Sequence, residues 1–367
     1  MSFYGFLKKL VLFVLIVAIA VPLRYGSTNH QYVLMRLLHS TLSLKHCLLS
    51  DQARPTLSAD YRAFEEILRM HLIPEIDPLR DPLSIVKEIR SSVSLAAAIP
   101  KPTHCQVTRQ VFEHDTHTVD AFWVNHHQKK LQKESNKIVL YFHGGGYISG
   151  DIHSYSGFEC HLSQLFNVTI LHVEYRLIPE HPFPAALDDA TAIYRALLLH
   201  NISPSQMVIM GDSAGGGLAL LTVQAIIARQ LSVPRGVIVL SPQTDLSLSG
   251  ESYTRNRLTD VMLSTNTTKW MVKILMGTNH PELSPDSSFF SPLFGTFEGF
   301  PPMYINVGTA DIIEDDSRRL VKKAQDAGVD VTFEEGLHLM HIYPIFFLYY
   351  PEARNTLNNI NKWIQKI

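Results

Sequence analysis

The sequence has few cysteines and no excess of charge of either sign, and each shortage excludes a class of protein. Its 367 residues include 32 lysines and arginines against 34 aspartates and glutamates, for a formal net charge of −2. A chain with this balance has no basic excess to attract nucleic acid, so we expect no nucleic-acid partner. Hydrophobic residues make up 46% of the chain, which predicts a folded protein with a sizeable core.

The three cysteines, Cys47, Cys105 and Cys160, are too few for a disulfide framework. They also show no C-x-x-C or Cys/His spacing of the kind that binds metal. One disulfide bridge with one free thiol, or three buried thiols, are both compatible with the sequence. Without a ligand spacing we expect no metal ion and no cofactor.

The N-terminus carries a long apolar run. Lys8 and Lys9 precede fourteen uncharged residues, 10–23, and Arg24 follows them. The run is shorter than the about 20 residues of a full membrane span, but the aromatic residues before it extend the apolar stretch through the interface. Residues 1–26 are therefore predicted to be a signal-anchor, with a cleaved signal peptide as the alternative.

Lysines on the N-terminal flank of the run favour a cytosolic N-terminus and a lumenal remainder. Three N-x-[ST] glycosylation sequons, at Asn167, Asn201 and Asn266, agree with that side of the membrane. We therefore expect a single-pass glycoprotein of the endoplasmic reticulum membrane whose main domain is lumenal. If the anchor is cleaved, the alternative is a secreted protein.

From about residue 105 the chain alternates short apolar strands with helices. Most of these strands are apolar on both faces, which implies a mostly parallel sheet covered by helices on both sides, an α/β fold. The expected strands lie within 105–113, 116–124, 137–145, 168–176, 206–213, 235–245, 301–311 and 329–336, and the expected helices within 184–200, 214–230, 317–328 and 351–367.

Two stretches depart from this alternation. Residues 31–100 show apolar residues at helical spacing, and 246–300 is a turn-rich insertion with one helix near Lys269 to Met276. An insertion after the carboxyl end of a strand lies on the side where open α/β sheets bind ligands, so both stretches are expected to cover a site. The expected parts are an anchor at 1–26, a helical cap made of 27–104 and 246–300, and a core made of 105–245 and 301–367.

A serine between glycines, in Gly211-Asp212-Ser213-Ala214-Gly215, is the first candidate for chemistry. A serine hydroxyl attacks a carbon only after a base removes its proton, and its position must leave room for substrate. A sharp turn from strand to helix meets this need, because the glycines relieve crowding around a strained serine. Since a strand precedes and a helix follows, the sequence predicts that Ser213 is a nucleophile.

The run His143-Gly144-Gly145-Gly146 follows another apolar strand. Attack on an ester makes a tetrahedral oxyanion, which needs preorganised hydrogen-bond donors. Glycines let backbone N–H groups approach that oxygen, so we predict Gly144, Gly145 and Ala214 as its donors. The run lacks the G-x-G-x-x-G spacing and the Lys-Ser/Thr of phosphate-binding loops.

The acid and the base of such a site follow the serine in chain order. Asp311 comes directly at the carboxyl end of a strand, whereas Asp315 and Asp316 come a turn later, where a helix N-terminus ordinarily explains them. We therefore predict Asp311 as the acid. After the last strand, His338 and His341 are both candidates for the base.

Together these motifs resemble one family. The chain from about 137 to 346 resembles the hormone-sensitive-lipase-like branch of the α/β-hydrolases, and within it the membrane-anchored arylacetamide deacetylase type. The motifs that carry the resemblance are HGGGY from 143, VEYRLIPEHPFPAALDD from 173, GDSAGG from 211, SPL from 291 and PPMYINVGTADIIEDDS from 301.

The resemblance implies an α/β-hydrolase fold with a helical cap, and a serine carboxylesterase or deacetylase. Its substrates would be short-chain, acetyl-like esters of hydrophobic alcohols, lipids or xenobiotics, cleaved through an acyl-enzyme. An amidase with the same machinery and a non-catalytic small-molecule receptor on the same fold are the alternatives. The histidines that follow the last strand favour the enzyme over the receptor.

The resemblance also implies a role for each motif residue. Family members usually have an apolar residue or methionine shortly before the catalytic histidine and an aromatic residue two places after it. Met340-His341-Ile342-Tyr343 fits that pattern, which favours His341 over His338 as the base. The implied roles are Ser213 as nucleophile, Asp311 as acid, Gly144, Gly145 and Ala214 as oxyanion donors, and Asp212 and Glu180 as structural residues.

Overall fold

The computed structural model describes residues 30–49, 51–70, 76–77, 80–92, 95–114, 117–125, 137–277 and 279–367. The predicted signal-anchor, 1–26, lies outside these ranges. Within them, no helix is both long enough and apolar enough to span a bilayer.

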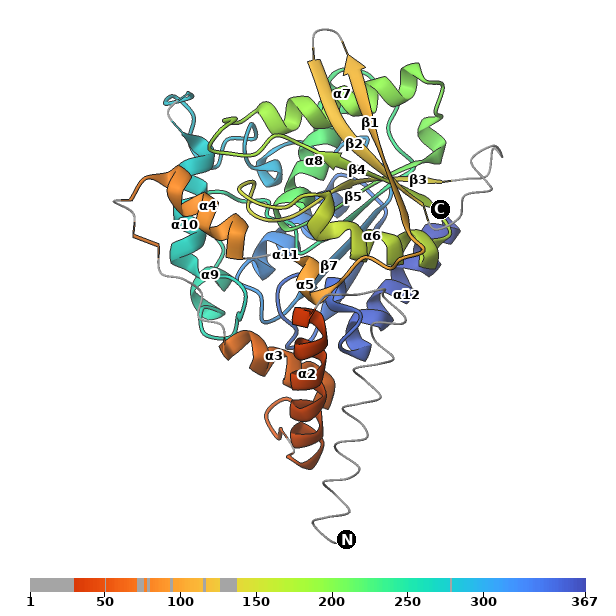
Figure 1. Cartoon of the computed structure of the whole chain (residues 1–367). Coiled ribbons are helices and arrows are strands. Elements are labelled where there is room, and N and C mark those ends of the chain that lie inside the picture. Colours follow the sequence, from red (N-terminus) through yellow and green to blue (C-terminus); the bar gives the residue numbers. More distant parts are fainter. Residues whose placement is uncertain are drawn as a thin grey trace, which may run out of the picture.

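One eight-stranded sheet forms the centre of the molecule, in the order β1-β2-β4-β3-β5-β6-β7-β8 (Figure 1). The strands from β4 to β8 are parallel, and β1 and β2 form an antiparallel hairpin at one edge. The predicted mostly parallel sheet is confirmed. The strands are β1 (Gln106–His114), β2 (His117–Asn125), β3 (Ile138–Phe142), β4 (Thr169–Glu174), β5 (Met207–Asp212), β6 (Gly236–Leu240), β7 (Met303–Gly308) and β8 (Val331–Gly336).

Helices cover both faces of the sheet because its inner strands are apolar on both sides. In β3, Leu140 and Phe142 pack into one core and Val139 and Tyr141 into the other. On the first face lie α7 (Ala185–Leu199), α8 (Ser213–Ala228) and α11 (Glu314–Asp326), and on the second lie α6 (Ile152–Phe166) and α12 (Pro351–Lys366) (Figure 1).

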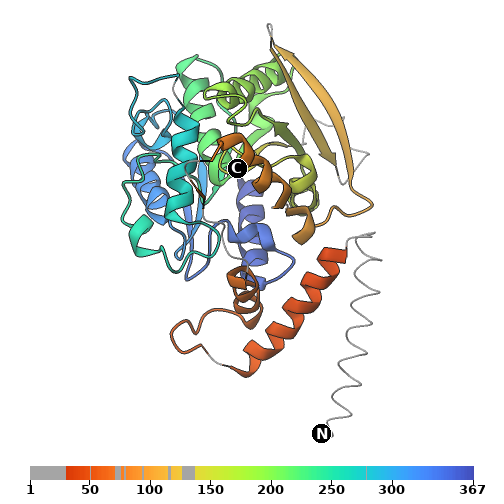
Figure 2. The ribbon, with the colours of Figure 1, turned by 60° about the vertical axis from the view of Figure 1, so that its left-hand side comes forward.

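Two further groups of helices lie outside this core. The first precedes the sheet in the chain, and its leading helix projects from the body of the molecule in Figure 2. The second lies in the insertion after β6, where the predicted helix is present as α10. The first group is α2 (His30–Leu48), α3 (Ala59–Met70), α4 (Pro82–Ser92) and α5 (Leu95–Ala98), and the second is α9 (Ser252–Arg255) and α10 (Thr265–Met276).

Helix α6, between β3 and β4, has no counterpart among the predicted elements. Asp151 caps its N-terminus by accepting a hydrogen bond from the Ser154 backbone amide at 2.7 Å. A disulfide joins Cys160 of this helix to Cys105, which comes just before β1, while Cys47 is an exposed free thiol. One bridge with one free thiol is therefore the correct alternative, and three buried thiols is wrong.

Candidate active site

Ser213 lies at a sharp turn between β5 and α8. Its φ of 52° is in the left-handed region, which few residues other than glycine adopt. A Cβ on Gly211 would overlap the carbonyl of Gly215, and one on Gly215 would overlap the carbonyl of Phe142. The glycines therefore let the turn form, and it leaves the Ser213 side chain partly exposed while its neighbours are buried.

Three side chains from different elements form one chain of hydrogen bonds. His341 Nε2 is 2.9 Å from Ser213 Oγ, and His341 Nδ1 is 2.7 Å from Asp311 Oδ2. The carboxylate accepts the Nδ1 proton, which leaves Nε2 free to accept the proton of the serine hydroxyl. Asp311 Oδ1 also accepts the Ile313 backbone amide at 2.9 Å, which fixes the orientation of the carboxylate.

The structure brings His341 to the serine and gives His338 a different place. The backbone amide of His338 donates to Thr309 Oγ1 at 2.7 Å, and its carbonyl accepts the Tyr61 hydroxyl at 3.3 Å. The loop that carries both histidines is held at Ile342, whose amide donates to Ser241 Oγ at 3.0 Å. This bond pins the residue that directly follows His341.

Opposing effects act on the pKa of His341, which is 2% exposed. Burial lowers its pKa because it disfavours the charged imidazole. The charge and the hydrogen bond of Asp311, together with the charges of Asp260 and Asp212, raise it and prevail, so the pKa lies above its ordinary value. The site is thus built to accept a proton on His341.

The backbone N–H of Gly144 is not available to a substrate oxygen. It donates to Asp212 Oδ1 and to the Tyr155 hydroxyl, each at 3.1 Å. The predicted role of Gly144 as an oxyanion donor is therefore corrected, because its amide faces the protein interior. Gly145 and Gly146 have φ values of 110° and 62°, and the structure describes no acceptor for the N–H of either.

Asp212 connects this glycine loop to the nucleophile turn. Its carboxylate is fully buried and accepts the hydroxyls of Tyr141 at 2.7 Å and Tyr155 at 3.0 Å. Burial raises its pKa to about 6, although these hydrogen bonds oppose the shift. The position of Asp212, one residue before Ser213, agrees with the structural role that the sequence predicts for it.

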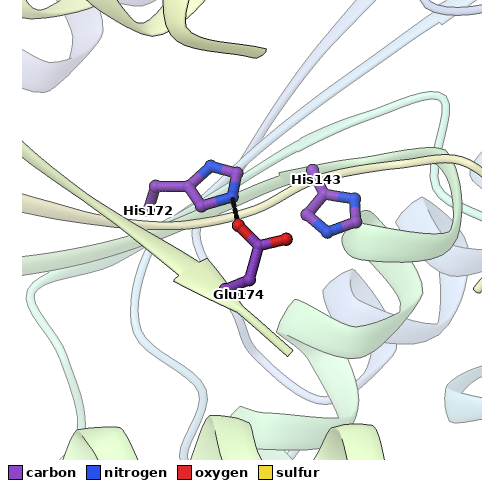
Figure 3. A group of neighbouring side chains, drawn as sticks. All are labelled: His143, His172 and Glu174. Atoms are coloured by element: carbon purple, nitrogen blue, oxygen red, sulfur yellow. Dashed lines mark ion pairs between the residues drawn. The ribbon is translucent and has the colours of Figure 1, made fainter. Parts of the chain in front are cut away.

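A group of titratable side chains, of which His143 and His172 are buried and Glu174 is partly exposed, lies at the start of the glycine loop (Figure 3). His143, His172 and Glu174 place ligand atoms within 4.8 Å of one another, and such a set could hold a metal ion. His172 Nδ1 is already 2.6 Å from Glu159 Oε1. Burial lowers the pKa of His172, but the two glutamates outweigh it and raise the value to about 10. A charged imidazole between two carboxylates compensates them, so a metal ion would first have to displace its proton.

Another carboxylate lies close to the acid of the hydrogen-bonded chain. Asp260, in the insertion, is 6% exposed and accepts the Ile312 amide at 2.9 Å, next to the Ile313 amide that Asp311 accepts. Burial raises the pKa of Asp260 to about 7, and the charge of Asp311 adds to the shift. Sequence reasoning missed Asp260 because it belongs to no motif, and its neighbours along the chain do not reveal the contact.

The insertion also reaches the glycine loop through α10. A Cβ on Gly146 would overlap Met271 Sδ, so this side chain packs directly against the loop. This contact brings the insertion to the glycine loop, as expected for a segment that covers the site. The predicted domain boundaries themselves stay a prediction.

Other acidic residues of the motifs have structural partners. Glu180 pairs with both terminal nitrogens of Arg90, at 2.6 and 3.0 Å. Asp315 pairs with Arg255 at 2.8 Å, and the buried Asp316 accepts two backbone amides that follow β6. These contacts agree with the predicted exclusion of Asp315 and Asp316 from catalysis.

A serine turn, a histidine and an aspartate at the carboxyl ends of parallel strands define a hydrolase of the α/β type. The sequence profile of the alpha/beta hydrolase fold matches residues 139–345, and the chain belongs to that family. The predicted fold is thereby confirmed.

Named relatives specify the reaction. The chain is 32% identical to an esterase of Acinetobacter venetianus over 231 residues, which cover 63% of this chain and 75% of that protein. It is 34% identical to an acetyl-hydrolase of Streptomyces hygroscopicus over 226 residues, which cover 61% of this chain and 74% of that protein. The protein is a carboxylic ester hydrolase.

Solved structures place it within the family. A crystal structure of an esterase from the bacterial hormone-sensitive lipase family has a TM-score of 0.73 and 27% identity, and covers 85% of this chain and 99% of that one. A crystal structure of an esterase/lipase from an uncultured bacterium has a TM-score of 0.73 at 28% identity, with 84% and 99% covered. The protein is therefore a hormone-sensitive-lipase-like α/β-hydrolase.

Proposed function

We propose that the protein is a serine carboxylesterase or deacetylase that removes short, acetyl-like acyl groups from hydrophobic alcohols through an acyl-enzyme. The observation that carries this proposal is the continuous chain of hydrogen bonds from Ser213 Oγ through His341 to Asp311. No step of the reaction requires a cofactor.

In the first half of the reaction, Ser213 Oγ attacks the ester carbonyl carbon while His341 Nε2 takes the hydroxyl proton. The carbonyl electron pair moves onto oxygen, and the N–H groups of Gly145, Gly146 and Ala214 stabilise the resulting oxyanion. Ala214 contributes because the first N–H groups of a helix have no partner within it. The C–O bond then breaks, and the leaving alcohol takes the proton from His341.

In the second half, a water molecule attacks the acyl-Ser213 carbonyl and gives a proton to His341 Nε2. Collapse of this second oxyanion releases the carboxylic acid, and the proton returns from His341 to Ser213 Oγ. Asp311 stabilises the imidazolium in both halves, which agrees with the direction in which it shifts the pKa of His341.

Short acyl groups and hydrophobic alcohols are proposed on two grounds. Met271 packs against Gly146 and so narrows the space beside the proposed oxyanion donors. Two of the relatives are named acetyl-hydrolase and ethyl acetate hydrolase. The sequence motifs support the finer assignment to the arylacetamide deacetylase type, in which an amide with the same acyl group is a second substrate.

We place the protein in the endoplasmic reticulum membrane, single-pass, with its catalytic domain in the lumen, or outside the cell if residues 1–26 are cleaved. All three sequon asparagines, Asn167, Asn201 and Asn266, are exposed, as glycosylation in the lumen requires. Mobility after glycosidase treatment of the protein from microsomes tests this placement, and an unglycosylated full-length chain would contradict it.

Loss of the nucleophile tests the proposed chemistry. Ser213→Ala is expected to lower kcat for p-nitrophenyl acetate by at least about 10³-fold, because the attacking atom is removed. A fluorophosphonate is expected to label wild-type Ser213 and not the variant. Binding of esters without turnover would instead favour the receptor.

The choice of base has its own test. His341→Ala is expected to abolish turnover, while His338→Ala is expected to retain much of it, because only His341 contacts Ser213. Retained activity in the first variant and lost activity in the second would reverse the assignment.

A further inference from the structure

Helix α2 has two opposite faces, and the body of the protein covers only one of them. On the covered face, Tyr32 is 2% and His39 4% exposed. His39 Nε2 lies 2.9 Å from the Asp60 carbonyl of α3, and Arg36 donates to the Leu348 carbonyl at 2.7 Å. These contacts fix the rotation of the helix, so its other face must point away from the protein.

The outward face carries leucines. Leu34 is 68% exposed, Leu38 38%, Leu44 48% and Leu48 80%, and Leu49 directly after the helix is 55% exposed. Five of the eleven large hydrophobic side chains that are exposed in the described ranges thus fall within residues 34–49. Single exposed leucines are ordinary, but a row of them at helical spacing marks a surface with a partner. We call this row the leucine face of α2.

The chain before α2 limits where this face can lie. The uncharged apolar run ends at Leu23, and α2 begins at His30. Seven residue steps span at most about 25 Å even when fully extended. If the run is inserted in a bilayer, as the proposed anchorage requires, α2 must begin at or near the membrane surface.

We propose that the leucine face of α2 docks on the lipid surface and forms a second membrane contact beside the anchor. This proposal rests on the membrane anchorage proposed above. A helix of this kind lies in the plane of the interface with its apolar side among the acyl chains, and removal of five exposed leucines from water drives the contact.

Docking would also hold the catalytic domain close to hydrophobic esters dissolved in the bilayer. Helix α3 contacts both α2 and the loop that carries the histidines, because His39 of α2 is bound to the Asp60 carbonyl and the Tyr61 hydroxyl donates to the His338 carbonyl. Ser58, at the start of α3, is bound to Glu352 of α12 through both its amide and its hydroxyl, at 2.7 and 2.8 Å. The α2–α3 pair is therefore joined firmly to the catalytic domain.

Depth-dependent quenching tests the proposal on the full chain. In a Cys47→Ser background, Leu38→Cys or Leu48→Cys carries an NBD fluorophore, and the protein is reconstituted in phosphatidylcholine vesicles with or without doxyl-labelled lipid. Leu199→Cys is the matched control, because Leu199 is 70% exposed on the remote helix α7. We expect the doxyl lipid to quench both α2 probes at least about twofold and to leave the control unchanged.

Each other outcome overturns the proposal in a distinguishable way. Vesicle-bound protein whose α2 probes respond like Leu199→Cys retains the anchor but excludes docking. Protein that does not bind vesicles at all excludes both the anchor and the docking. Its esterase activity in detergent is measured separately and tests the proposed function alone. Disulfide crosslinking of two Leu38→Cys chains in detergent would show that a second copy covers the face instead.

A second variant separates docking from folding. Leu34→Glu/Leu38→Glu is expected to abolish quenching of the Leu48→Cys probe by placing charges in the interface. Its activity on soluble p-nitrophenyl acetate is expected to stay within about twofold of the parent, because neither leucine contacts the active site. Quenching that survives both substitutions would contradict the proposal.

Discussion

At the scale of single residues, the charges around His341 set the pH range in which the enzyme works. His341 acts as a base only when it is neutral, and its pKa lies above the ordinary 6.5. We expect kcat/KM for p-nitrophenyl acetate to rise with pH, with its half-maximal value above pH 6.5.

Asp311→Asn is expected to lower kcat on the order of 10⁴-fold. It is also expected to move the rising limb of the kcat/KM profile to lower pH, because the charge that stabilises the His341 imidazolium is lost. A limb that stays in place would contradict the assignment of Asp311.

The second carboxylate is expected to act on the same limb. Asp260 raises the pKa of His341 through its charge without a hydrogen bond to it. Asp260→Asn should therefore shift the limb to lower pH while lowering kcat by less than about tenfold. Asp286→Asn, an exposed change in the same insertion, is the control and should leave the profile in place. An unchanged profile in Asp260→Asn would restrict Asp260 to a structural role.

The sequence predicts the hydrogen-bonded residues well because their motifs encode local geometry. Ser213 follows from a strand and a helix around it, and Asp311 from its place at the end of a strand. The predicted role of Gly144 as an oxyanion donor is wrong because the direction of its amide depends on Asp212, which is distant in the chain. The motif has a third glycine, Gly146, and only the folded loop shows that its amide has no acceptor among the described residues.

At the scale of elements, α10 is expected to limit the length of the acyl group. Met271 packs on Gly146 of the glycine loop, so Met271→Ala is expected to open space beside the proposed oxyanion donors. The ratio of kcat/KM for butyrate over acetate esters is expected to rise about tenfold. Lys273→Ala, an exposed change on the same helix, is the control. An unchanged ratio would place the acyl group elsewhere.

Helix α6 is expected to support the glycine loop through one hydroxyl. Tyr155→Phe removes both the bond to Asp212 and one of the two acceptors of the Gly144 amide. We expect the free energy of unfolding to fall by about 1 to 3 kcal/mol in urea titrations. We expect kcat to fall as well, because the glycine loop loses a hydrogen bond that fixes its position. Tyr194→Phe loses a hydroxyl bond to the Ser232 carbonyl far from the loop, so it should lower stability alone. Equal kcat in the two variants would contradict this role.

Element prediction succeeds where the pattern is strong and fails where packing decides. The inner strands are continuous apolar runs, and the sheet contains every strand expected from them. Helix α6 was missed because its sequence mixes polar residues with Gly157, a weak helix former. That glycine is required by tertiary contact, since a Cβ there would overlap the carbonyl of Ile99.

At the scale of the whole molecule, the core and its coverings have different origins. The family profile spans 139–345, which holds the catalytic core. Helices α2 and α3 lie outside that span, and their sequence shows helical periodicity without revealing what they contact. The cysteine pairing was unreadable for the same reason, because Cys105 and Cys160 are 55 residues apart and meet only in the fold.

An acyl group is expected to pass through Ser213 in every turnover, and rapid-quench mass spectrometry of the enzyme with an acetyl ester detects that intermediate. We predict an acetyl group on the peptide that contains Ser213, formed and lost at rates that account for turnover, and absent in Ser213→Ala. Turnover at the full rate with no acetyl group on Ser213, or with the acetyl group on another residue, would contradict nucleophilic catalysis by Ser213.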